Sequence, residues 1–299
     1  MLTKLHILLT YNCSLKCKHC YVYSSQRAAG KISLSQISYI LNEALQILGV
    51  SWIYFGGGEP FTQYPMLLKA VQRARKKGFE VGVSTNGYFA RNVDTGIRFL
   101  RPLAEMGVKD IRISNDNLHY KKPETSPAKH TLKAAAKLGL PTTLVRVSFP
   151  GESQSYQDGG EIATMVIDKR LMFTGRAAET ISDWKPDNDW RGFEVCPRKD
   201  LGDPDELYID AYGYVQICPG IAIGNICEKP LHAIIKGFIP FEHDLIRYLL
   251  RQGPAGVIRN FNLQSTKKFV EPCHCCYSVR GELIDRFPEI IAPRHVYGY

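Results

Sequence analysis

Features that mark membrane, secreted and disordered proteins are missing from this sequence of 299 residues. No apolar stretch approaches the roughly 20 residues that cross a bilayer. The start, MLTKLHILLTYNCS, has one lysine and too short an apolar run for a secretory signal. No internal repeat or low-complexity tract is evident, and a hydrophobic share of 44% with 22% charged residues excludes a disordered chain. We therefore expect a folded cytoplasmic protein with no membrane partner.

The charge is unbalanced, because 38 Lys and Arg residues exceed 29 Asp and Glu residues and give a net charge of +9. Such an excess favours an anionic partner, for example an acidic peptide, a phosphorylated metabolite or nucleic acid. Arg73, Arg75, Lys76 and Lys77 fall on one expected helix with no aromatic residues between them, which is typical of a solvated surface. We therefore do not expect nucleic acid as the partner.

Short apolar runs alternate with amphipathic segments through the first 180 residues. The expected strands are residues 4–9, 51–55, 80–84, 110–114, 143–149 and 170–173. The expected helices are residues 35–48, capped by Ser35, and then 66–78, 93–107 and 127–139, each ending at a glycine. This alternation predicts an α/β fold with parallel strands, and six units predict a partial (β/α)6 barrel. In such folds the site lies at the carboxyl ends of the strands.

The periodic pattern stops near residue 180, and a cysteine-rich segment follows it. We predict a barrel domain over residues 1–180 and a small domain over residues 181–299. The second domain contains a hairpin signal, LYIDAYGYVQIC, that turns at Tyr212-Gly213, and helical stretches around residues 230–251.

Nine cysteines without a secretory signal argue against disulfides and for metal binding or catalysis. None lies between Cys20 and Cys196, so the thiols form two groups. The first, Cys13, Cys17 and Cys20, places three thiolates within eight residues. A closed structural site uses four ligands, whereas a catalytic centre keeps one position open. The alternative is a zinc site completed by His19 or by a distant cysteine.

A second motif, Gly56-Gly57-Gly58-Glu59-Pro60, directly follows the second expected strand. Its glycines allow a ligand to approach the backbone, and Glu59 can receive an ammonium group. The cysteine triplet followed by this motif resembles the radical S-adenosylmethionine (SAM) superfamily, and His19 occupies the place of an aromatic residue in the family pattern.

The resemblance implies a 4Fe-4S cluster on Cys13, Cys17 and Cys20 whose fourth iron binds SAM. Reductive cleavage of SAM then yields a 5′-deoxyadenosyl radical, which abstracts a hydrogen atom from the substrate. Glu59 and the adjacent glycines would hold the SAM ammonium. The other expected cofactor contacts are His19, Gly57, Gly58, Ser84, Asn86, Ser114, Asp116 and Arg146. Arg146 pairs either with the SAM carboxylate or with an acid of the protein core.

The C-terminal cysteines resemble an auxiliary-cluster extension called SPASM, or its shorter version, twitch. The resemblance implies a second 4Fe-4S cluster, held by Cys196, Cys218, Cys273 and Cys276. Cys276 is preferred over Cys275 only because of its x2 spacing from Cys273, and a zinc ribbon is the alternative. Gly175-Arg176-Ala177 resembles a linker found in relatives, and Arg176 is a candidate for binding a substrate carboxylate or, alternatively, an exposed structural arginine.

Enzymes with these extensions modify ribosomal peptides or oxidise small alcohols. The resemblance therefore implies a peptide substrate or, alternatively, a small metabolite, and an electron donor such as flavodoxin or ferredoxin. Cys227 and Cys275 are not needed as ligands, and either thiol could return a hydrogen atom to a carbon radical in an epimerisation. Two hypotheses from other classes are a non-catalytic metal-binding module and an RNA-binding protein.

Overall fold

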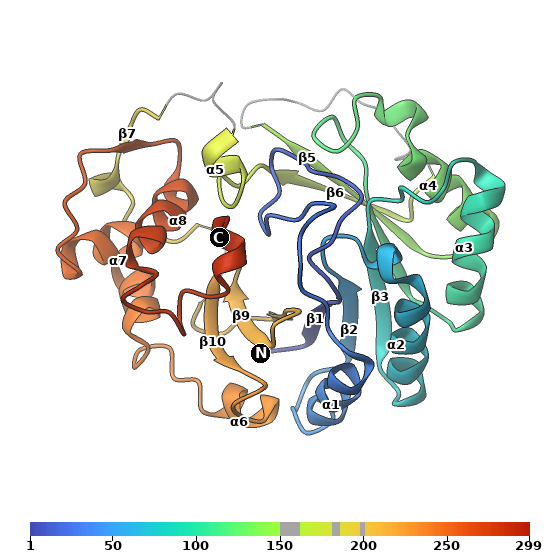
Figure 1. Cartoon of the computed structure of the whole chain (residues 1–299), viewed down its shortest axis with the longest axis horizontal. Helices are drawn as coiled ribbons and strands as arrows, with labels where there is room; N and C mark the ends of the chain where they lie inside the picture. The colour runs from blue at the N-terminus through green and yellow to red at the C-terminus, as the bar shows by residue number, and fades with distance from the viewer. Residues whose placement is uncertain (150–161, 181–185, 198–200) are drawn as a thin grey trace.

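A nine-stranded, mostly parallel sheet runs through the protein in the order β10-β9-β8-β1-β2-β3-β4-β5-β6 (Figure 1). The computed structural model describes residues 1–149, 162–180, 186–197 and 201–299. Neighbouring strands from β1 to β6 are parallel. The α/β class is therefore confirmed. These six strands are β1 (Lys4–Leu8), β2 (Trp52–Gly56), β3 (Glu80–Thr85), β4 (Asp110–Ser114), β5 (Thr142–Ser148) and β6 (Met165–Arg170).

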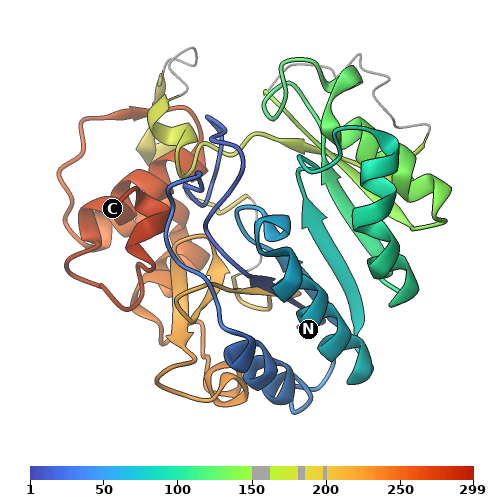
Figure 2. The ribbon, with the colours of Figure 1, turned by 45° about the vertical axis from the view of Figure 1, so that its right-hand side comes forward.

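Four helices connect the first five strands and cover one side of them (Figure 2). The second, third and fourth of these helices begin and end within about two residues of the predicted bounds. A glycine with positive φ follows each of the three, at Gly78, Gly107 and Gly139. Their apolar residues are buried in one core with the strands. The helices are α1 (Leu34–Ala44), α2 (Tyr64–Lys76), α3 (Val93–Glu105) and α4 (Pro127–Lys137), with short 3-10 turns η1 (Pro60–Gln63) and η2 (Pro123–Thr125).

The expected cap of the first helix was wrong by two residues. Ser33, not Ser35, caps α1, since its side chain accepts a hydrogen bond from the Gln36 backbone N–H while the Gln36 side chain accepts one from the Ser33 N–H. This reciprocal pair satisfies two helix-end donors. Ser35 therefore lies inside the first turn of the helix.

The sixth strand was also expected too far along the chain, at residues 170–173, whereas β6 ends at Arg170. Leu171 and Phe173 supplied the apolar signal, but both are buried in a small cluster of their own that also includes Ala177. Most of β6 is exposed. The apolar residues therefore mark the chain that leaves the strand, and not the strand itself.

The sheet continues across the expected domain boundary at residue 180. β8 (Glu206–Ile209) pairs with β1 in parallel, and it forms the predicted hairpin with β9 (Tyr214–Cys218), turning at Gly213. The hairpin is confirmed, and the division into two domains stays a prediction. The remaining elements are β10 (Ile221–Asn225), β7 (Asn188–Asp189), β11 (Lys268–Phe269), α5 (Ala177–Thr180), α6 (Leu231–Lys236), α7 (Asp244–Asn260), α8 (Pro272–Leu283), η3 (Trp190–Gly192) and η4 (Arg294–Tyr297).

A buried polar junction joins the two halves of the chain. The Tyr11 hydroxyl donates to Asp210 Oδ2 at 3.0 Å, and Gln216 Nε2 donates to the same oxygen at 2.6 Å. The Tyr11 ring lies 4.2 Å from the His295 ring, so the C-terminal end of the chain returns to the loop that follows β1 (Figure 1). The loop after β1 is therefore held by both halves of the protein.

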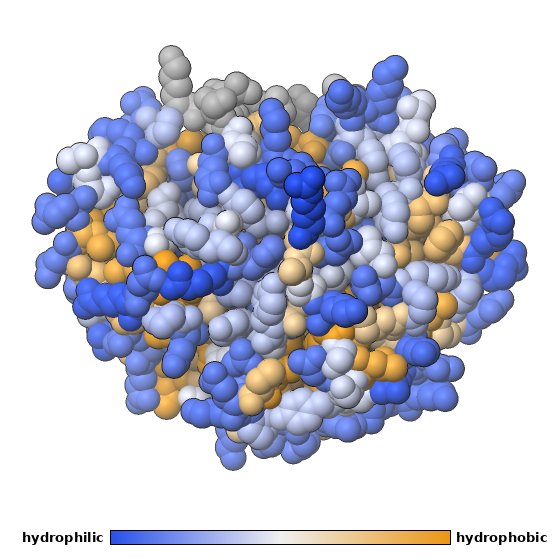
Figure 3. Space-filling view, viewed as in Figure 1, coloured by the Kyte–Doolittle hydropathy of each residue, from blue (hydrophilic) through white to orange (hydrophobic). Residues whose placement is uncertain are grey.

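The outer surface shown in Figure 3 is mostly hydrophilic, with apolar side chains in small groups. Among the helices of the described residues, none is long and apolar enough to cross a membrane.

Candidate functional site

The cysteine triplet lies in the loop between β1 and α1, at the carboxyl end of the parallel strands. Backbone bonds fold this loop back on itself, from Tyr11 N to Gly30 O at 3.1 Å and from Cys13 N to Ser25 O at 3.0 Å. The loop also brings the three thiols near one another. Their proximity is seen in the electrostatic interactions among Cys13, Cys17 and Cys20. The triplet is therefore one group in space as well as in sequence.

The first two thiols of the triplet are poor acids in this setting. Burial raises the pKa of Cys13 and of Cys17 to about 12, and the charge of Glu59 adds to the rise at Cys13 while the neighbouring thiols add to it at Cys17. Nearby N–H groups point at the sulfurs, since Leu15 N donates to Cys13 Sγ at 3.4 Å and Ser24 N donates to Cys20 Sγ at 3.3 Å. Grouped thiols of this kind ionise when bound cations compensate their charge, so the chemistry of these ligands suits a metal cluster, although their spacing does not suit a single metal ion.

Glu59 lies beside the triplet and has no exposed surface. Its Oε1 accepts hydrogen bonds from Phe61 N at 3.0 Å and from Thr85 Oγ1 at 2.9 Å, and its Oε2 accepts one from Asn86 N at 2.7 Å. Burial raises the pKa of Glu59 to about 7, although these three donors oppose the rise. Because each carboxylate oxygen can accept two bonds, Oε2 keeps capacity for one further donor.

Asn86 connects this carboxylate to the cysteine loop. Its backbone N–H binds Glu59, while its side-chain Nδ2 lies 3.6 Å from Cys13 Sγ and 3.2 Å from Ser14 Oγ. Tyr120 Oη donates to the Asn86 carbonyl at 2.7 Å. Asn86, a predicted cofactor contact, therefore lies between the triplet and Glu59.

The glycines of the Gly-Gly-Glu segment fit tightly against the cysteine loop. A Cβ on Gly58 would lie 2.5 Å from Asn12 O and 2.7 Å from Tyr11 O, and one on Gly57, whose φ is +142°, would lie 2.4 Å from Thr10 O. Gly58 N and Glu59 N donate to this stretch of backbone, at 2.7 and 2.9 Å. These glycines therefore allow two loops to pack together, and their expected contact with a ligand stays a prediction.

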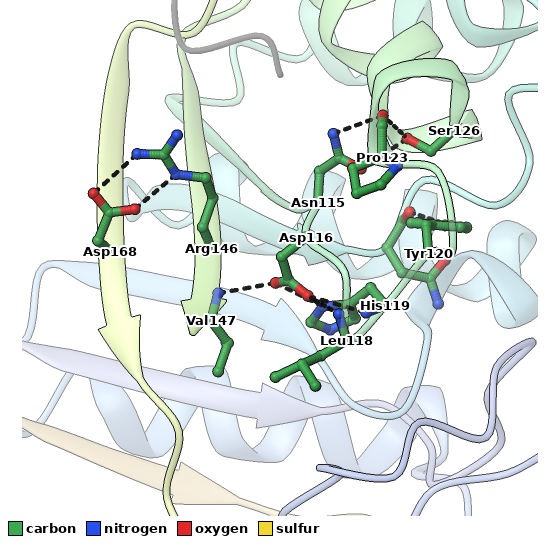
Figure 4. A network of polar contacts seen from close by, with 11 residues as sticks. Asn115, Asp116, Leu118, His119, Tyr120, Pro123, Ser126, Arg146, Val147 and Asp168 are labelled. Carbon is green, nitrogen blue, oxygen red and sulfur yellow. Dashed lines mark hydrogen bonds and ion pairs between the residues drawn. The ribbon is translucent and has the colours of Figure 1, made fainter. Parts of the chain in front are cut away.

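Asp116 holds the ends of β4 and β5 together (Figure 4). Its carboxylate accepts bonds from the backbone N–H groups of Leu118, His119 and Val147, and it pairs with His119 Nδ1 at 2.9 Å. Burial opposes ionisation, but the His119 ring and these donors outweigh it and keep the pKa of Asp116 below its usual value. Its assignment to SAM stays a prediction.

His19 extends this network to the triplet, because its ring meets the His119 ring edge-on at 4.5 Å. The side chain is buried, and Nδ1 has no hydrogen-bond partner among the described residues. Burial lowers the pKa of His19 to about 3, so the ring is neutral. His19 thus presents an apolar, uncharged ring between two proposed iron ligands.

Arg146 forms an ion pair with Asp168 across β5 and β6, from Nε to Oδ1 at 2.6 Å and from Nη2 to Oδ2 at 2.9 Å (Figure 4). Arg146 therefore pairs with an acid of the protein, but this acid is exposed and does not belong to the core as expected. Ser84 and Ser114 are partly exposed at the carboxyl ends of β3 and β4.

Four of the six C-terminal cysteines also form a group. Cys273 and Cys276 face the same side of α8 at a spacing of three, and both interact electrostatically with Cys196 and Cys218. Burial raises the pKa of Cys273 and raises that of Cys276 to about 11. No disulfide joins any of the nine cysteines.

The two spare cysteines lie elsewhere. Cys275 is fully buried in the apolar core, whereas Cys227 is exposed and follows β10, with its Sγ 3.2 Å from where a Cβ on Gly213 would be. The helix thus turns Cys276, and not Cys275, toward the other three thiols. Within the described ranges, no group of three or more His, Cys, Asp or Glu residues lies close enough together to hold a single metal ion.

Arg176 is buried and binds the cysteine loop. Nη1 donates to Cys17 O at 2.6 Å, Nη2 donates to Ser24 O at 2.7 Å, and the Arg176 N–H donates to Cys20 O at 3.0 Å. A contact with a substrate carboxylate, or else an exposed structural position, was expected for this side chain. Its guanidinium instead organises the loop that carries the triplet.

A family model for the radical SAM superfamily matches residues 7–158, just over half of the chain. This match covers the cysteine loop, the Gly-Gly-Glu segment and the parallel strands that hold them. The chain therefore belongs to the radical SAM superfamily, whose members use a 4Fe-4S cluster and SAM.

Two relatives by sequence and one by fold show the range of this likeness. A tungsten-containing aldehyde ferredoxin oxidoreductase cofactor-modifying protein of Pyrococcus furiosus is 33% identical over 38% of this chain and 31% of its own length. The antilisterial bacteriocin subtilosin biosynthesis protein AlbA of Bacillus subtilis is 37% identical over 28% of this chain and 18% of its own length. The crystal structure of SuiB of Streptococcus suis bound to the precursor peptide SuiA shares the fold, with a TM-score of 0.61 and 13% identity. The match covers 91% of this chain and 76% of the SuiB chain. The chain thus aligns with under a third of the length of these two sequence relatives.

We predict that Gly58→Ala lowers the free energy of unfolding by about 2 kcal/mol, because the new Cβ meets backbone oxygens that cannot move aside alone. Gly192→Ala is the matched control, since a Cβ there meets nothing within 4 Å, and a change below about 0.5 kcal/mol is expected. Chemical denaturation of both variants checks this. Equal stability losses would show that the two loops do not pack as described.

Proposed function

We propose that this protein is a radical SAM oxidoreductase or peptide-modifying maturase with two iron-sulfur clusters. The observation that carries the proposal is the buried connection of the cysteine triplet, through Asn86, to the Glu59 carboxylate. It puts an open three-thiol site and an acceptor for an ammonium group next to each other. In this proposal the six parallel strands form a partial barrel, and their carboxyl ends face the substrate.

Cys13, Cys17 and Cys20 would hold the first cluster, and Glu59 Oε2 would accept the SAM ammonium with its remaining capacity. The cluster and SAM, when bound, supply reductive cleavage and a 5′-deoxyadenosyl radical that takes a hydrogen atom from the substrate. The chain's own residues position and shield these groups. Asn86 fixes the Glu59 carboxylate, Arg176 fixes the loop, and the neutral His19 ring keeps water from its side of the site.

Cys196, Cys218, Cys273 and Cys276 would hold the second cluster, of the SPASM or twitch type. Their mutual proximity supports this assignment, because four neighbouring thiols supply the four ligands that a closed cluster requires. The zinc-ribbon alternative would use the same four residues, although in the described part of the chain they do not lie close enough together to hold a single metal ion. Metal and sulfide analysis separates the two.

We propose a peptide as the substrate. The sequence relative that takes part in bacteriocin biosynthesis and the shared fold with a precursor-peptide complex support this choice. The second candidate is a small molecule, and the cofactor-modifying relative of Pyrococcus furiosus favours it.

An electron donor such as flavodoxin or ferredoxin would dock where the cysteine loop reaches the surface. Lys16, Lys18 and Arg27 are exposed on this loop, and an open cavity of about 420 Å³ beside it is lined by Lys16, Arg27 and Arg176, among others. A cationic surface attracts an acidic protein and speeds its encounter. This placement brings the donor close to the first cluster.

We predict that anaerobically reconstituted protein binds about eight irons and about eight sulfides, four of each per cluster. Replacing Cys13, Cys17 and Cys20 by alanine should leave about four irons, and replacing Cys196, Cys218, Cys273 and Cys276 should also leave about four. Chemical iron and sulfide assays with zinc analysis measure this.

Cys275→Ala is the matched control for Cys276→Ala. The buried Cys275 variant should keep about eight irons, whereas the Cys276 variant should lose iron from the second cluster. Stoichiometric zinc without sulfide would contradict both cluster assignments, and loss of iron only from the Cys275 variant would reverse the choice of ligand.

We predict that Glu59→Gln weakens SAM binding at least tenfold and leaves the iron count unchanged, because it removes an anionic acceptor but no thiol. SAM affinity of the parent should fall as the pH drops below about 7, since the raised pKa of Glu59 makes its carboxyl neutral there. Equilibrium SAM binding from pH 6 to 8.5 tests both. A variant that keeps the affinity and pH dependence of the parent would remove Glu59 from the SAM site.

An epimerisation through a thiol remains a branch of the peptide proposal. The exposed Cys227 fits a hydrogen donor, and the core position of Cys275 does not. With substrate in deuterated water, epimerisation should place solvent deuterium at the inverted carbon, and Cys227→Ala should lose that product but still cleave SAM. A product that has lost two hydrogens in the parent and the variant alike would instead indicate oxidation.

A further inference from the structure

Arg280 is a buried cation at the C-terminal cysteine group. It belongs to α8, is 1% exposed, and is the largest of the fully buried side chains of the described residues. Its Nε donates to Cys276 O at 3.2 Å, and its Nη1 donates to Pro219 O at 3.0 Å and to Tyr297 Oη at 2.7 Å. Pro219 directly follows Cys218. The guanidinium thus bridges the backbone at or beside two of the four proposed ligands.

No carboxylate balances this charge in the part of the chain that the structure describes, because none of the ion pairs found there includes Arg280. A guanidinium stays protonated in proteins, and an uncompensated buried charge costs several kcal/mol. The groups that interact with it electrostatically are Tyr297, Cys276 and Cys218. Burial raises the pKa of Tyr297, so the phenol stays neutral. The sulfurs of Cys276 and Cys218 therefore lie where negative charge would balance the guanidinium.

Iron-bound thiolates at Cys276 and Cys218 would supply such a charge. A 4Fe-4S cluster with four thiolate ligands carries a net negative charge in both of its usual oxidation levels. The position of Arg280 matches a negatively charged group on Cys276 and Cys218.

Arg176 provides an internal comparison at the N-terminal group. It is 6% exposed and also donates to carbonyls of the cysteine loop, at Cys17 and Ser24. Each cysteine group therefore has one buried guanidinium on its backbone. The two arginines come from separate parts of the chain, so each can be changed without touching the other site.

We propose that Arg280 is the resident countercharge of the C-terminal cluster and raises its reduction potential. The inference rests on the proposed function, in which Cys196, Cys218, Cys273 and Cys276 hold that cluster. Reduction adds one negative charge to the cluster, and a fixed cation in a water-poor interior stabilises the more negative state. Arg280 is a positioning residue in this role, because it acts through the cluster.

The test uses the full chain with Cys13, Cys17 and Cys20 replaced by alanine, so that only the C-terminal cluster is present. Anaerobic redox titration with dithionite, followed by electron paramagnetic resonance, measures its potential. Arg280→Gln should lower the equilibrium constant for one-electron reduction about tenfold or more, which is about 59 mV. Arg280→Lys keeps the charge and should stay near the parent.

Two controls separate charge from structure. Tyr297→Phe removes a hydrogen-bond partner of Arg280 but no charge, and Arg176→Gln removes a buried guanidinium from the other group. Both should leave the potential of the C-terminal cluster unchanged. A shift in Tyr297→Phe as large as that in Arg280→Gln would show that the effect is structural, and would overturn the proposal.

The iron count distinguishes failure of this inference from failure of the proposed function. If the triple-alanine protein holds no iron and sulfide, the cluster assignment itself is wrong. If it holds about four irons and Arg280→Gln leaves the potential unchanged, the cluster stands and the countercharge role is wrong. If Arg280→Gln fails to take up iron, uptake by Arg280→Lys supports the role of charge. If Arg280→Lys also fails to take up iron while Tyr297→Phe takes it up normally, the result contradicts the role of charge.

Discussion

The packing of the cysteine loop against the Gly-Gly-Glu segment is the constraint on which the site depends. Two backbone bonds join these loops, and the space for any Cβ at Gly57 or Gly58 is filled by backbone oxygens. This contact buries Glu59 completely and sets it beside Asn86, which reaches Cys13. A carboxylate buried at this depth is stable only with its donors in place. Local fit between two loops therefore fixes the distance between the thiols and the Glu59 carboxylate.

The same loop also ties the two halves of the protein together. β8 pairs with β1, and the Tyr11 hydroxyl reaches Asp210 and, through it, Gln216 on β9, the strand that ends at Cys218. The two cysteine groups thus lie on one continuous framework of sheet and buried hydrogen bonds. An auxiliary cluster that exchanges electrons with a substrate near the first cluster needs such a fixed separation. Arg176 and Arg280 strengthen this framework, because each binds the backbone of one cysteine group.

Much of this could be predicted from the sequence, because local patterns are strong where the fold is regular. The glycines after three helices, the hairpin at Gly213 and the strand ends that carry Glu59 and Asn86 were expected and lie in those places. The sixth strand was misplaced because its own residues are exposed, and the apolar signal came from Leu171 and Phe173 beyond it. The roles of Thr85 and Arg280 could not be predicted, since each depends on a partner far away in the sequence.

The most direct test of this account is SAM cleavage by the reconstituted protein under dithionite, measured as 5′-deoxyadenosine by chromatography. The parent should form 5′-deoxyadenosine, and so should a variant that lacks Cys196, Cys218, Cys273 and Cys276, because that group does not bind SAM in this account. The variant that lacks Cys13, Cys17 and Cys20 should form none. Formation of 5′-deoxyadenosine by the last variant at the rate of the parent would contradict the assignment of the N-terminal site.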